Sequence, residues 1–78
     1  MKNKIIDFVQ KSSLFRYEGE ENDAYLFSKR INGYEDVVFG EKLKKQILDN
    51  FSNINVKTKI VDEWVLLFVS DVKKAGVK

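Results

Sequence analysis

Two adjoining β-type segments near the C-terminal end constrain the fold more than any other feature of the sequence. Apolar and polar side chains alternate along residues 54–61, which is typical of a strand with one buried face. Residues 64–70 are apolar at almost every position, which is typical of a central strand or one covered on both sides. Only Asp62 and Glu63 separate the two segments, so we expect a tight turn between them.

Two segments have the apolar spacing of amphipathic helices. Residues 3–12 place their apolar side chains on one side of a helical wheel and their charged side chains on the other. Residues 41–52 repeat this spacing, and Gly40 precedes them as a helix cap. The predicted apolar stripe of the second helix consists of Leu43, Ile47, Leu48 and Phe51.

The segment between the two helices predicts three strands. Residues 14–18 and 23–31 are rich in β-forming side chains, and the acidic stretch 18–23 between them contains Gly19 and Asn22 and predicts a turn. The dipeptide 32–33, Asn-Gly, is a strong hairpin signal because both turn positions need positive φ. We therefore expect a third strand over residues 34–39.

These elements predict an α+β fold with the order α-β-β-β-α-β-β, in which two helices pack on one face of an antiparallel sheet. The 78 residues suffice for a single domain, residues 1–78, whose tail over residues 73–78 is expected to fray. The alternating aromatic residues are expected to form the sheet face that contacts the helices: Phe15, Tyr17, Tyr25 and Phe27.

Composition narrows the chemistry. The chain has no cysteine and no histidine, which removes thiolate chemistry, the commonest metal ligands and the commonest general base at neutral pH. We therefore expect no catalytic residue, no metal and no cofactor. The absence of cysteine favours a reducing compartment, hence a cytoplasmic location. The longest strictly apolar run, residues 64–69, is too short to span a bilayer, so no membrane partner is expected.

An acidic stretch is the first candidate surface. Residues 18–23 carry four acids and no base, and a predicted hairpin tip would expose them. Two interpretations remain: a solvated turn, or a tip that steers the chain to a basic partner surface. The candidate partner-binding residues are Glu18, Glu20, Glu21 and Asp23.

Lysines provide the second candidate surface. Three of them would occupy the first turns of the helix over residues 41–52, where cations oppose the macrodipole unless an anion lies there. The alternatives are a solvated helix face and a phosphate-contacting surface of a nucleic-acid-binding domain. The residues of that surface would be Lys29, Arg30, Lys42, Lys44, Lys45, Lys57 and Lys59.

The favoured hypothesis is a small non-enzymatic protein-binding module, such as the inhibitors and adaptors that phages and mobile elements direct at host proteins. It rests on the lack of catalytic groups and on the segregation of acidic and basic residues along the chain. The net charge of only +2 is too small to indicate a nucleic-acid partner by itself. Nucleic-acid binding is the alternative, an enzyme is a third hypothesis, and a structural homodimer built on residues 64–69 is a fourth. The chain is expected to be a monomer or a homodimer, and Trp64 is either a core anchor or an interface hot spot.

Overall fold

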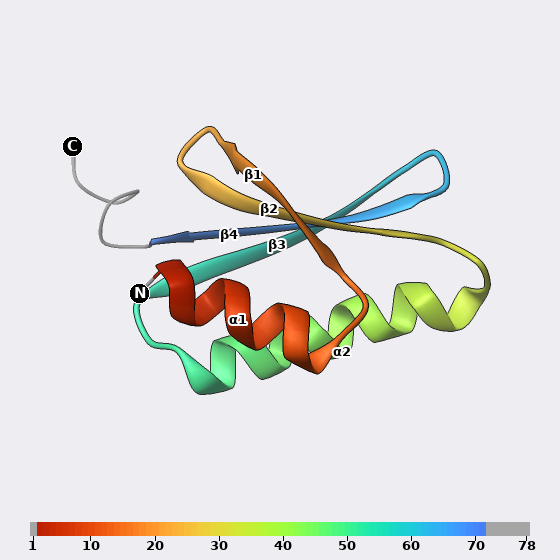
Figure 1. Ribbon diagram of the computed structural model, residues 1–78. Helices are drawn as coiled ribbons and strands as arrows, with labels where there is room; N and C mark the ends of the chain where they lie inside the picture. Colours follow the sequence, from red (N-terminus) through yellow and green to blue (C-terminus); the bar gives the residue numbers. More distant parts are fainter. Residues whose placement is uncertain (1, 72–78) are drawn as a thin grey trace.

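A four-stranded antiparallel sheet with two helices on one side makes up the computed structural model, which describes residues 2–71 (Figure 1). The predicted frayed tail, residues 73–78, lies outside the described residues. The α+β class, the antiparallel sheet and the placement of both helices on one face are confirmed. The elements are α1 (Lys2–Ser12), β1 (Arg16–Glu21), β2 (Ala24–Arg30), α2 (Tyr34–Asn50), β3 (Ile54–Val61) and β4 (Trp64–Asp71).

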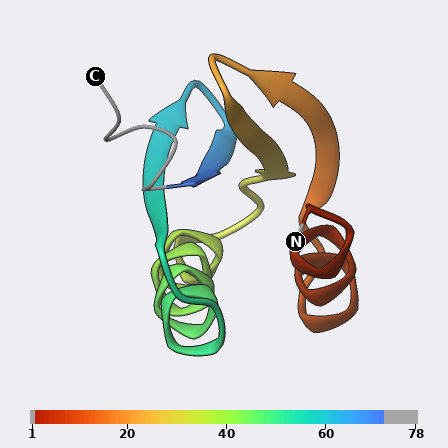
Figure 2. The same ribbon diagram turned by 90° about the vertical axis from the view of Figure 1, so that its left-hand side faces the viewer.

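The sheet has the strand order β1-β2-β4-β3, so the two hairpins meet along β2 and β4. The apolar strand β4 lies between two others, in agreement with its sequence. The backbone N–H of Ile31 donates to the carbonyl of Glu63 at 2.6 Å, which joins the end of β2 to the turn of the second hairpin. Helix α2 packs against β3 and β4, and α1 packs against β1 (Figure 2).

The hydrophobic core fills the space between the helices and the sheet. Phe27 of β2 and Leu67 of β4 are opposite each other in register, and neither is exposed to solvent. The ring of Tyr17 lies 5.4 Å from the ring of Phe27, so the predicted aromatic face does contact the core. Besides these, the core includes Ile5, Val9, Phe15, Leu43, Ile47, Ile54, Val56, Val65 and Val69.

The predicted third strand over residues 34–39 is wrong, because this segment forms the first turns of α2. Gly33 is not a hairpin residue: its φ of −166° is extended backbone that any residue adopts, and it is the N-cap of the helix. The carboxylate of Asp36 accepts hydrogen bonds from the backbone N–H groups of Asn32 and Gly33, at 2.7 and 3.2 Å. These bonds satisfy donors just before the helix and favour a helix start where the β-propensity favoured a strand.

The first hairpin is tighter than the sequence predicted. Strand β1 begins at Arg16 and continues through Glu21, so only Asn22 and Asp23 form the turn. Their φ values of 53° and 65° are both positive, as in a type I′ hairpin turn. Gly19 is not part of the turn. It lies at an irregularity in the β1–β2 register with a φ of 120°, which glycine adopts readily.

Candidate functional site

The sheet surface that points away from the helices is the first candidate site, and we call it the open face. Leu26, Leu66 and Phe68 alternate along their strands with core residues, so they belong to the open face. Leu26 is opposite Phe68, and all three are half-buried between their neighbours. Trp64 also belongs to this face and is 43% exposed. No helix within residues 2–71 covers these side chains (Figures 1 and 2).

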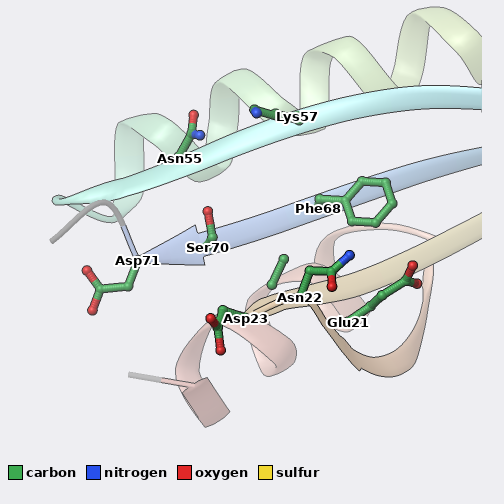
Figure 3. A pocket seen from close by; sticks show the side chains of 9 residues that line it. Glu21, Asn22, Asp23, Asn55, Lys57, Phe68, Ser70 and Asp71 are labelled. Carbon is green, nitrogen blue, oxygen red and sulfur yellow. The ribbon is translucent and has the colours of Figure 1, made fainter. Parts of the chain in front are cut away.

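A hollow of about 300 Å³ lies at one end of the open face (Figure 3). Phe68 and Ser70 of β4 lie in the middle of the hollow, between the turn of the first hairpin and strand β3. Carboxylates therefore border one side and Lys57 the other, with apolar carbon between them. The other residues that line the hollow are Glu21, Asn22, Asp23, Ala24, Asn55 and Asp71.

The four predicted acidic residues do not form one exposed tip. Glu18, Glu20 and Glu21 belong to β1, and only Asp23 lies in the turn. Glu18 accepts a hydrogen bond of 2.6 Å from the hydroxyl of Ser28, a buried residue of β2. Glu20 is opposite Tyr25, whose side chain packs against the core, whereas Glu21 is opposite Ala24 and lines the hollow. The structure thus brings only Glu21 and Asp23 to the hollow.

The predicted basic residues are dispersed over three places. Lys57 and Lys59 lie on β3 and share the open face. Lys42, Lys44 and Lys45 lie in the middle of α2, beneath the other side of the sheet. The sequence predicted that these lysines oppose the macrodipole at the positive end of the helix. This is wrong, because α2 begins eight residues before Lys42, at Tyr34. The first turn of α2 carries acidic residues instead, Glu35 and Asp36.

The last two predicted basic residues form ion pairs. Lys29 contacts Asp36 at 3.0 Å, and the two side chains are only 10% and 15% exposed. Arg30 contacts Glu63 at 2.7 Å, but these side chains are 62% and 67% exposed. The hydrogen bond from the Asn32 N–H, followed by the one from Lys29, lowers the pKa of Asp36 below its ordinary value of 3.8. The Lys29–Asp36 pair therefore holds the start of α2 against the end of β2.

Replacement of Asp36 by asparagine is expected to lower the melting temperature at pH 7, because Lys29 loses its ionic partner and the cap of α2 weakens. The lowered pKa means that the native carboxylate stabilises the fold above pH 3.8 and that this contribution is lost as pH falls below it. The melting temperatures of native chain and Asp36→Asn should therefore converge only below pH 3.8. Thermal unfolding between pH 7 and pH 2 measures this.

Glu63→Gln is the matched control, because it removes one carboxylate from an exposed pair. Exposed ion pairs contribute little to stability, so this variant should melt close to the native chain at every pH. A gap between Asp36→Asn and the native chain that is equally wide at pH 7 and pH 2 would contradict the assigned role of the carboxylate.

The apolar centre of the open face was only partly predicted from the sequence. The signal was present in residues 64–70, which are apolar on both faces, but the sequence does not say which face the helices cover. Among residues 2–71 there is no cluster of three acidic side chains arranged to hold a metal ion. No helix in the same part of the chain is long and apolar enough to cross a membrane.

Comparisons with known proteins give no relative from which a role could be transferred. No protein-family model, no curated protein and no solved structure matches this chain. The open face and its hollow are therefore the features of the chain from which a function can be inferred.

Proposed function

We propose that the chain is a small non-enzymatic protein-binding module, an inhibitor or adaptor, that contacts its partner with the open face. The observation that carries this proposal is an uncovered sheet surface with apolar side chains at its centre, Leu26, Leu66 and Phe68, and charged residues at its borders. Protein interfaces commonly combine such an apolar centre with a polar rim. Trp64, at 43% exposure, is a suitable anchor at one end of this surface.

The charge distribution favours a protein partner over a nucleic acid. Glu21 and Asp23 border the same hollow as Lys57, so a phosphate chain that followed Lys57 across the hollow would meet carboxylates. The carboxylates of Asp36 and Glu63 already engage Lys29 and Arg30. A protein surface with patches of both signs complements this arrangement better than a polyanion does.

The test compares two double variants that replace exposed or half-exposed apolar residues by polar ones suited to the local structure. Leu66→Thr with Phe68→Thr alters the centre of the open face and keeps β-forming side chains. Val38→Gln with Leu48→Gln alters exposed apolar positions of α2 and serves as the matched control. Each is used, beside the native chain, to capture and then titrate binding partners from an extract of the source cells, and the captured material is then treated with nuclease.

We expect a protein that binds the native chain and the α2 variant alike but binds the open-face variant at least about tenfold more weakly. Unfolding curves for all three chains ensure that the loss is not a loss of fold. Equal affinity for the two double variants would remove the open face as the contact surface. A captured ligand that nuclease releases would favour the nucleic-acid alternative instead.

A further inference from the structure

The two edge strands of the sheet, β1 and β3, differ in how regularly they pair with their neighbours. Strand β1 forms one edge and is interrupted by the irregularity at Gly19, which disturbs a regular pairing surface. Strand β3 forms the other edge and pairs with β4 without interruption over all eight of its residues, 54–61. Within the described part of the chain, β3 has a neighbouring strand on one side only. Its outer backbone groups are therefore arranged to pair with a further strand.

Two lysines mark this edge on the open face. Lys57 and Lys59 are two residues apart on β3, so they project to the same side of the sheet. The side chain of neither lysine forms a hydrogen bond or an ion pair with any residue between 2 and 71. An added strand would place two of its own alternate residues directly opposite these ammonium groups, where opposite charge stabilises the pair and like charge destabilises it.

A second copy of the chain is a poor occupant of this edge. If β3 of one copy pairs antiparallel with β3 of a second copy, the open faces of the two sheets become continuous only when the numbers of the two paired residues differ by an even number. The registers that use most of the strand then place Lys57 opposite Lys57 or Lys59 of the other copy. Such like-charged pairs oppose self-association and leave the edge to a different partner.

We infer that β3 binds an extended acidic segment of a partner protein, which adds to the sheet as a fifth strand. This inference rests on the proposed function and specifies how the partner is recognised. The segment carries acidic residues at two alternate positions, opposite Lys57 and Lys59, and main-chain hydrogen bonds to β3 hold it. The new strand would also widen the open face, with β3 and Lys57 between it and Phe68 of β4.

The helix side of β3 specifies the intervening residues of the segment. Ile60 projects to this side and is 53% exposed, so an apolar residue of the added strand can cover it. Thr58 donates a hydrogen bond of 2.7 Å to the carboxylate of Glu41 in α2, which places a negative charge beneath the middle of the strand. Acidic residues therefore fit the open-face side of the added strand, and apolar residues fit the helix side.

The experiment titrates the isotope-labelled full chain with three capped peptides and follows backbone amide signals and amide hydrogen exchange. The first peptide is Thr-Val-Glu-Val-Glu-Val-Thr, and the second has lysine in place of both glutamates. The third has proline in place of the central valine, which keeps the charges but removes a main-chain donor. The same titrations are repeated with the Lys57→Glu, Lys59→Glu double variant and with a Lys42→Glu, Lys45→Glu control on α2.

We expect the glutamate peptide to bind at least about tenfold more tightly than the lysine peptide and to protect alternate amides of β3 from exchange. The proline peptide should lose this protection. The β3 double variant should reverse the preference between glutamate and lysine peptides, whereas the α2 control should retain it. If Lys57 and Lys59 only kept the chain soluble, their replacement would not reverse the preference between the two peptides.

The inference would be overturned if no peptide bound at millimolar concentration, or if binding left the β3 amides unprotected. It would also fail if sedimentation showed that native chains self-associate through β3. Each of these results could occur while the open-face double variant still lost its captured partner, so the strand-addition inference can fail without the proposed function. Loss of both would remove the protein-binding proposal as well.

Discussion

Phe27→Ala is expected to lower the free energy of unfolding by about 3–5 kcal/mol, which is a large part of the stability of a small domain. Phe27 lies in the middle of β2, is fully buried, and contacts the ring of Tyr17. It is also opposite Leu67, another fully buried residue. Removal of the ring leaves a cavity that residues from both hairpins and the helices line, and a close-packed core of this size cannot collapse to fill it.

Urea unfolding followed by the fluorescence of Trp64, the only tryptophan in the chain, measures this loss. Leu14→Ala is the control, since Leu14 is 75% exposed and its truncation should change the stability by less than about 0.5 kcal/mol. Similar unfolding midpoints for the two variants would mean that Phe27 does not occupy the centre of the core.

Gly40→Leu is expected to destabilise the domain by about 1–3 kcal/mol, although leucine forms helices far better than glycine does. Gly40 is buried in α2, where the helix lies close to Val65 of β4. A Cβ atom at this position would lie 3.1 Å from a methyl carbon of Val65 and 3.6 Å from the ring of Phe15. A leucine side chain has no room there, so α2 must move away from β4.

Lys45→Leu provides the comparison, because Lys45 is an exposed residue of the same helix. The same side chain at that position should leave the unfolding midpoint almost unchanged. If Gly40→Leu were as stable as Lys45→Leu, the close approach of helix and sheet at Gly40 would be refuted.

The candidate site was only partly predictable from the sequence. Lys57 and Lys59 were recognised as a pair on one strand face, since alternation alone determines that. Their assignment to the open face depends on where α2 packs, and so does the exposure of Leu66 and Phe68. The acidic residues Glu18 and Glu20 looked equivalent to Glu21 in the sequence. The irregularity at Gly19 and the contact with Ser28 gave them different surroundings.

The sequence alone determined those elements whose apolar pattern has a single explanation. The helix over residues 2–12, the strand over 54–61 and the strand from Trp64 were predicted close to their observed bounds, because burial of one face or of both faces leaves a distinct period. For the same reason the antiparallel α+β class followed from the sequence.

Only the tertiary structure determined that residues 34–39 form a helix and not a strand. Their β-forming side chains and the preceding Asn-Gly favour a strand, but Lys29 and the backbone before the helix hold Asp36 at its start. Gly40 then acts as a contact point rather than a helix boundary, since Val65 and Phe15 approach it closely. The physical reason is that local propensities differ by about 1 kcal/mol or less per residue, whereas each buried apolar side chain contributes about 1.5–3 kcal/mol. Contacts between distant segments therefore decide the conformation wherever local preferences are weak.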